Sequence, residues 1–163
     1  MLLATDLDGT FLGGAPDRKA ALYQIINHHQ TLQLVFVSGR GLDSILPLFN
    51  DPLMPQPDFI ICDVGATVVN GRSLQPVEPI QSLIKERWPG REKVAALLEE
   101  VRGLLPQEVP QQRRCSYFYH EHTDLDDLRY RVEQLNCDLI LSAGKFADVL
   151  PKGINKGYSL RSL

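Results

Sequence analysis

The sequence lacks any run of the roughly 20 apolar residues that a membrane-spanning helix needs. No basic segment precedes its first apolar stretch, so nothing there is typical of a secretory signal. Lys and Arg are scattered, and with a net charge of −3 there is no basic patch to attract nucleic acid or a membrane surface. We therefore expect a cytoplasmic protein with a small-molecule partner. The sequence does not indicate an oligomeric state.

Cysteine is also scarce. Cys62, Cys115 and Cys137 lie far apart in the sequence and form no Cys-x-x-Cys pair, which argues against a zinc or redox motif. Because a free cysteine behaves as a small apolar residue, we expect all three to be reduced and to lie in the core or in strands.

Strand and helix patterns alternate over the first 62 residues. Short apolar runs predict strands over Met1 to Thr5, Thr31 to Val37 and Asp58 to Cys62. Between them, helical spacing and turn residues predict helices over Asp17 to Gln30 and Leu42 to Phe49. This order is typical of an α/β fold, a Rossmann-like core with a parallel sheet and right-handed connections.

A second unit begins after a predicted turn at Asn70-Gly71 and a linker marked by Pro76 and Pro79. We expect a small α+β domain inserted into the first, and hence three segments: core over 1–78, cap over 79–150 and a returning core segment over 151–163. The following list gives the elements expected after the linker: helix Arg91 to Leu104, strand Arg113 to Tyr119, helix Asp124 to Leu135, strand Cys137 to Ser142, strand Phe146 to Leu150, and a helix capped by Asn155.

Two carboxylates, Asp6 and Asp8, end the first predicted strand in the segment Asp-Leu-Asp-Gly-Thr. If the backbone stays extended they point the same way, whereas a turn at Gly9 re-aims the second. Such a pair can hold a divalent cation and can supply a nucleophile for phosphorus, Asp6, beside an acid and base, Asp8. The alternative is that the segment is only a turn.

Two further segments could bind phosphate. Ser38, Gly39 and Arg40 follow the second predicted strand, and ligands gather outside the carboxyl ends of parallel strands. A hydroxyl and amides at a helix start can donate to phosphate oxygens. Lys156 lies at a helix start, where the dipole disfavours a cation unless an anion is near. The alternatives are a plain loop and a solvated lysine.

Together the three segments resemble the first three motifs of the haloacid dehalogenase phosphatases. The inserted α+β cap is similar to that of the Cof-type sugar phosphatases and sucrose-6-phosphate phosphatases. Stretches such as Ser142-Ala143-Gly144-Lys145 and Asp148-Val149-Leu150-Pro151 resemble the latter. The likeness covers the whole chain.

The resemblance implies a magnesium-dependent phosphatase for a sugar phosphate. It implies Asp6 as nucleophile, Asp8 as acid and base, and Lys156 as the charge clamp. Ser38, Gly39 and Arg40 would surround the phosphate, and Mg²⁺ would bind the Asp6 side chain and the Asp8 carbonyl. In the cap, Lys145 and Asp148 are expected to bind sugar hydroxyls, the alternative being a solvated hairpin.

One departure from the family concerns the fourth motif, Gly-Asp-x-x-x-Asp, which follows the third-motif lysine at some distance. Only seven residues follow Lys156, so we expect the chain to be a fragment whose strand bearing Asp6 lies at a sheet edge. Asp63 is a candidate substitute for the missing metal ligands. Two hypotheses remain: a sugar-phosphate phosphatase, or a non-catalytic phosphatase-like module or inactive fragment.

Overall fold

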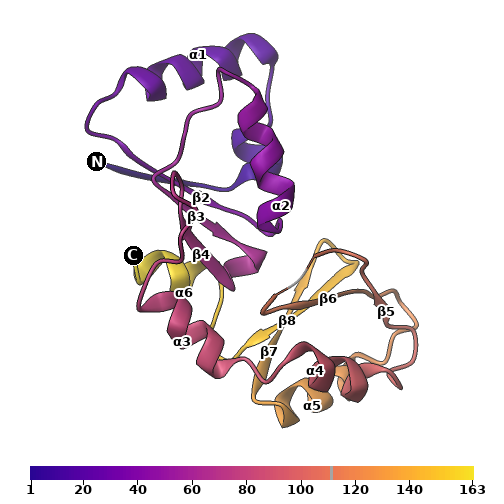
Figure 1. Ribbon diagram of the computed structural model, residues 1–163. Coiled ribbons are helices and arrows are strands. Elements are labelled where there is room, and N and C mark those ends of the chain that lie inside the picture. The colour runs from indigo at the N-terminus through magenta and orange to yellow at the C-terminus, as the bar shows by residue number, and fades with distance from the viewer. Residues whose placement is uncertain (111) are drawn as a thin grey trace.

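The first sheet contains four strands in the order β1-β2-β3-β4 in the computed structural model, which describes residues 1–110 and 112–163 (Figure 1). They are β1 (Leu2–Thr5), β2 (Gln33–Val37), β3 (Phe59–Cys62) and β4 (Thr67–Asn70). The first three are parallel, and β4 is antiparallel to β3. Because β1, β2 and β3 are parallel, their carboxyl ends lie side by side at one end of the sheet. β1 is the edge strand, as the sequence predicted.

Helices cover both faces of this sheet. One face carries α1 (Pro16–His28) and α2 (Leu42–Ile45), which continues as a 3₁₀ turn over Leu46–Asn50. The other carries α3 (Ile80–Arg87) and α6 (Lys156–Arg161). The alternation of side chains along β2 separates the two layers: Leu34 and Phe36 pack with the first pair of helices, Val35 and Val37 with the second.

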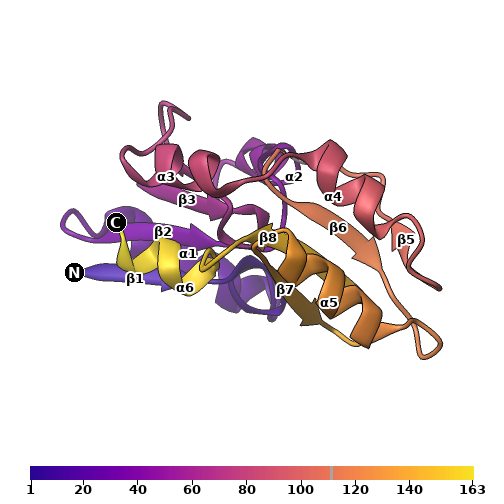
Figure 2. The ribbon, with the colours of Figure 1, turned by 90° about the horizontal axis from the view of Figure 1, so that it is seen from below.

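The second sheet is antiparallel, with strand order β5-β6-β8-β7. Its strands are β5 (Leu105–Pro106), β6 (Cys115–Phe118), β7 (Cys137–Ser142) and β8 (Phe146–Pro151). Helices α4 (Arg91–Leu98) and α5 (Leu125–Gln134) pack on the face turned away from the first sheet (Figures 1 and 2). The opposite face is left free to form a site with the core.

The α/β class with a parallel sheet is confirmed, and an α+β unit follows it. All three cysteines are free and buried, as expected. The predicted helix over Arg91 to Leu104 was too long, because the chain leaves the helix at Leu98 and turns at Gly103, whose φ is 77°. Within its described residues the chain has no helix long and apolar enough to cross a membrane.

Helix α3 was not predicted, because Pro76 and Pro79 were interpreted as a linker. Its buried residues Ile80 and Ile84 pack against the first sheet. The division into 1–78, 79–150 and 151–163 stays a prediction, and this packing favours a first boundary near Pro89.

Candidate active site

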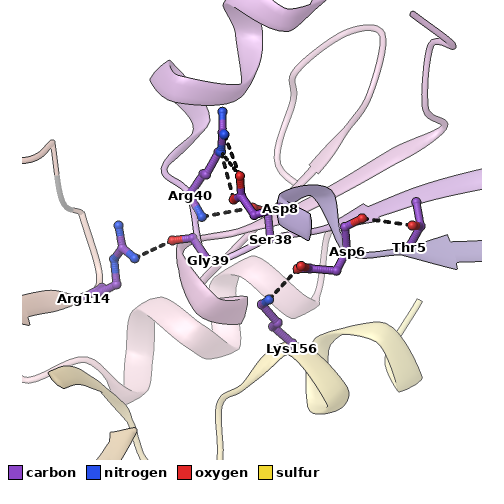
Figure 3. Close-up of polar contacts among 8 residues, drawn as sticks. All are labelled: Thr5, Asp6, Asp8, Ser38, Gly39, Arg40, Arg114 and Lys156. Carbon is purple, nitrogen blue, oxygen red and sulfur yellow. Dashed lines mark hydrogen bonds and ion pairs between the residues drawn. The ribbon is translucent and has the colours of Figure 1, made fainter. Parts of the chain in front are cut away.

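Asp6 directly follows β1, and Asp8 lies in the irregular turn over Leu7–Phe11 that comes next. Leu7 and Phe11 are buried and anchor this turn, while Gly9 adopts a φ of 68°, which a residue without Cβ accommodates at no steric cost. The turn sends the two carboxylates to different partners (Figure 3). Of the two geometries that the sequence allowed, the structure therefore has the one in which the second carboxylate is re-aimed.

The partner of Asp8 is Arg40, from the turn after β2. Arg40 Nη2 lies 2.6 Å from Asp8 Oδ1, and Nε lies 3.0 and 3.2 Å from the two carboxylate oxygens. The hydrogen bonds from Arg40 lower the pKa of Asp8, and those to Asp8 raise the pKa of Arg40. Asp8 is consequently ionised at neutral pH in this arrangement.

Ser38 and Gly39 precede Arg40 in the same turn. The Ser38 amide continues the sheet by donating to the Ile61 carbonyl at 2.8 Å, and the Ser38 hydroxyl oxygen accepts the Arg40 amide at 3.0 Å. Ser38 is fully buried. Its hydroxyl thus shapes the turn that presents Arg40.

The partner of Asp6 is Lys156, whose Nζ lies 2.7 Å from Asp6 Oδ1 although the residues are 150 positions apart. Lys156 begins α6, which Asn155 caps by accepting the Tyr158 amide at 2.9 Å. The helix is seated on Gly65, whose carbonyl accepts the Ser159 hydroxyl at 2.7 Å. The position of Lys156 therefore depends on contact between α6 and the turn after β3.

A cleft of about 550 Å³ lies between these strand ends and the open face of the second sheet. Several predicted residues line it: Asp8, Gly39, Arg40, Asp148 and Lys156. Asp6 lies in an adjoining hollow of about 300 Å³ that shares Lys156 with the cleft. Lys145 is not among the lining residues, and its ammonium group lies 4.9 Å from the centre of the Phe146 ring. Lys145 and Asp148 are thus not brought together, and their role in sugar binding stays a prediction.

The family model for sucrose-6F-phosphate phosphohydrolase matches residues 1–163. The chain belongs to this family. The fold agrees with this. The sucrose-phosphatase of Synechocystis sp. PCC6803, which was solved in complex with sucrose and phosphate, superposes on this chain with a TM-score of 0.82. The two are 22% identical, and the match covers 99% of this chain and 68% of that one. A haloacid dehalogenase-like hydrolase from Bacteroides thetaiotaomicron superposes with a TM-score of 0.60 at 18% identity, over 99% of this chain and 74% of that one.

Relatives of this sucrose-phosphatase family member differ in length. A glucosylglycerol-phosphate synthase of Pseudomonas anguilliseptica is 54% identical over the whole chain, which spans only 22% of that protein. A mannosylfructose-phosphate phosphatase of Agrobacterium fabrum is 29% identical over 98% of the chain and 67% of its own length. Sucrose-phosphatase 1 of Nicotiana tabacum is 25% identical over the whole chain and 41% of its own length.

Two residues that line the cleft, Val64 and Arg114, were not predicted from the sequence to lie there, and Asp63 was predicted only as a substitute metal ligand. Asp63 and Val64 have φ values of 53° and 58°, a strained conformation for residues with a Cβ and especially for a β-branched one. Burial raises the pKa of Asp63, and Arg114 opposes that rise. Asp63 contacts Arg114 and Thr67, which is no arrangement of metal ligands. Arg114 was expected within the strand Arg113 to Tyr119, but it precedes β6 and its side chain reaches the core.

Proposed function

We propose that this chain carries the nucleophile and phosphate-binding residues of a phosphomonoester hydrolase that acts on a glycosyl phosphate through an aspartyl-phosphate intermediate. The proposal rests on two contacts at the carboxyl ends of the parallel strands: Asp6 with Lys156, and Asp8 with Arg40. Two carboxylates beside two cations, at the mouth of a cleft, suit the attack of a carboxylate on a phosphate dianion.

In the first step Asp6 attacks phosphorus, so that a bond forms between its carboxylate oxygen and phosphorus. The bond to the sugar oxygen breaks, and that oxygen takes a proton from Asp8. Water then attacks phosphorus, gives its proton to Asp8 and releases inorganic phosphate, which restores Asp6. Lys156 and Arg40 would neutralise the phosphoryl oxygens during both steps.

The contact between Asp8 and Arg40 suits the second step better than the first. An ionised Asp8 is ready to accept a proton from water. To protonate the leaving oxygen, Asp8 must first take up a proton, and a neutral carboxyl group has little attraction for the guanidinium. Substrate binding is therefore expected to draw Arg40 away from Asp8 toward the phosphate.

Magnesium fits the donors at this site because Asp6 and Asp8 offer hard oxygen atoms. In phosphate sites Mg²⁺ commonly uses one or two carboxylates and completes its shell with water and phosphate oxygens. Across the described residues no group of three His, Cys, Asp or Glu side chains is placed to hold a metal. The Asp6 carboxylate and the Asp8 carbonyl would hold the ion, which when bound would offset the repulsion between Asp6 and the phosphate.

For the substrate we favour glucosylglycerol phosphate, followed by sucrose 6-phosphate and mannosylfructose phosphate. Each is a phosphate monoester on a glycoside, and each is named in a protein or family that this chain resembles. The relative with 54% identity is a synthase of glucosylglycerol phosphate by name. A phosphatase attached to such a synthase would consume its product.

The test is release of inorganic phosphate from a panel: glucosylglycerol phosphate, sucrose 6-phosphate, mannosyl-3-phosphoglycerate and simple hexose phosphates, with and without Mg²⁺. It should be run on this chain and on any longer gene product that contains it. We expect turnover only with Mg²⁺, and we expect Asp6→Asn to reduce it to background. Asp17→Asn, an exposed change on α1, is the matched control. Activity near wild type in Asp6→Asn would remove Asp6 from the nucleophile role.

The second candidate function is a non-catalytic module that binds a glycosyl phosphate for an attached synthase. Two observations favour it: both carboxylates are already paired with cations, and the chain matches a 22% portion of a synthase. Saturable binding of glucosylglycerol phosphate by the full gene product, without release of phosphate, would favour this candidate over the hydrolase.

A further inference from the structure

Arg114 crosses from the second sheet to the first. It directly precedes β6, and its side chain is 7% exposed. Nη1 donates to the Gly39 carbonyl at 2.7 Å (Figure 3). Nη2 lies 3.1 Å from Asp63 Oδ1, so both contacts reach strand ends of the core. A third contact, from Nη1 to Asp148 Oδ1 at 3.6 Å, remains within the cap. One guanidinium thus joins the two units where the cleft opens.

The contact with Gly39 fixes a particular peptide plane. The peptide between Gly39 and Arg40 has its carbonyl held by Arg114, and its N–H donates to Ser38 Oγ at 3.0 Å. Because a peptide is planar, holding both ends fixes its orientation. The next carbonyl, that of Arg40, accepts the Asp63 amide at 2.7 Å. The backbone that carries the Arg40 side chain to Asp8 is therefore held partly from the cap.

A purely structural explanation exists for two of the three contacts. Asp63 and Asp148 are buried carboxylates, and a buried charge without a partner is strongly destabilising, so Arg114 would be needed to neutralise them. That explanation does not cover Gly39, whose carbonyl is uncharged. Lysine could supply the charge, but it lacks the planar fork that contacts an acceptor on each side.

We propose that Arg114 is a positioning residue that couples the placement of the cap to the phosphate-binding turn, by holding the Gly39–Arg40 peptide in the orientation that presents Arg40. The proposal rests on the proposed phosphatase function for its effect on rate. Its effect on the conformation of Arg40 does not depend on that function. Without the contact from Arg114, the turn would lose a hydrogen bond and Arg40 would lose its fixed position.

The experiment compares Arg114→Gln and Arg114→Lys with Arg113→Gln, the same change at the neighbouring arginine, which bonds to Gln112 on the surface. The full gene product is assayed for kcat and KM with Mg²⁺, and its unfolding is followed by circular dichroism. A misplacement of about 1 Å can cost about 10²-fold in rate, so we expect kcat to fall by about that factor in both Arg114 variants. Arg114→Lys should retain more of the stability than Arg114→Gln, because lysine keeps the positive charge. Arg113→Gln should keep kcat within about twofold of wild type, because substitutions of surface residues usually have effects of that size or smaller.

A second readout is independent of turnover. The Arg40 Nε–H donates to Asp8, and its ¹⁵N-detected signal reports on that bond. We expect slow exchange and a distinct shift in wild type and in Arg113→Gln, and loss of both in Arg114→Lys. An unchanged Arg40 signal in folded Arg114→Lys would overturn the proposal, as would a kcat that falls only with the folded fraction. A wild type without turnover would defeat the proposed function and leave the signal to decide the role of Arg114.

Discussion

Replacement of Gly65 by alanine tests whether the packing of α6 on the turn after β3 places Lys156, the lysine proposed to neutralise the phosphate. A Cβ built at Gly65 would lie 2.3 Å from the Asn155 carbonyl carbon and 2.6 Å from both the Asn155 oxygen and the Lys156 nitrogen. All three atoms are backbone, so no side chain can swing away. Ordinary contact begins near 3.4 Å, so α6 must retreat by roughly 1 Å, which is enough to cause the overpacking cost seen when an extra methyl group is forced into a packed core.

The expected loss has two parts. Gly65 has a φ of 108°, and an alanine there costs about 1–3 kcal/mol in backbone strain. The forced retreat adds about 1–3 kcal/mol, as overpacking does elsewhere. A shift of about 1 Å would also carry Lys156 Nζ from 2.7 Å beyond hydrogen-bond length of Asp6, with a loss of about 10²-fold in kcat.

Gly90→Ala is the matched control. Its φ of 105° is nearly the same, but a Cβ there would meet only the Glu92 carboxylate oxygen at 3.8 Å. The difference between the two variants in urea unfolding therefore isolates the clash, and phosphate release isolates its effect on Lys156. Equal stability and equal kcat in Gly65→Ala and Gly90→Ala would refute the idea that close approach of α6 to this turn positions the site.

Three further predictions concern other parts of the chain. Asn155→Ala and Asp124→Ala each remove one helix cap, a hydrogen bond of 2.9 and 3.0 Å respectively. Each should lower the free energy of unfolding in urea by about 1 kcal/mol. Only Asn155→Ala should lower kcat, because only α6 carries Lys156. Burial raises the pKa of the Cys115 thiol to about 11 and raises that of Cys62 further. Iodoacetamide at pH 8 should therefore leave both thiols unmodified until guanidinium unfolds the chain, and rapid labelling of the folded chain would contradict this. Burial also raises the pKa of Asp148, so the folded state binds its proton more tightly than the unfolded state and loses that stability as pH rises through the raised pKa. The free energy of unfolding of wild type, relative to Asp148→Asn, should therefore fall from pH 4 to pH 7, and a rise over that range would show that the contact with Arg114 outweighs burial.

The sequence predicted the placement of most charged groups because they follow short apolar strands. Asp6 directly follows β1, and Arg40 lies in the turn that follows β2; parallel strands bring those ends together wherever the intervening helices lie. Lys156 follows β8, a strand of the second sheet, so the strand order does not bring it near Asp6. Only the resemblance to the family placed Lys156 beside the two carboxylates. Its contact with Asp6 depends on the seat at Gly65, a packing relation that no local pattern encodes.

Two features were not predicted, for different reasons. The start of α3 was hidden by Pro76 and Pro79, although the spacing of Ile80 and Ile84 was a usable helical signal. Arg114 gave no signal at all. A period of two tells which residues share a face of a strand, but it does not tell which core loop lies opposite that face.

The paired charges at this site have a consequence for the proposed reaction. With Lys156 on Asp6 and Arg40 on Asp8, the four side chains sum to no net charge, so the site needs no substrate to remain stable. A phosphate dianion competes with both carboxylates for both cations. Once the phosphate binds both cations, the Asp6 oxygen is free to attack, and the guanidinium that holds the pKa of Asp8 low has moved away from Asp8. The exchange of partners that binds the phosphate is thus also the event that prepares the nucleophile and the acid, and neither is prepared until the substrate is in place.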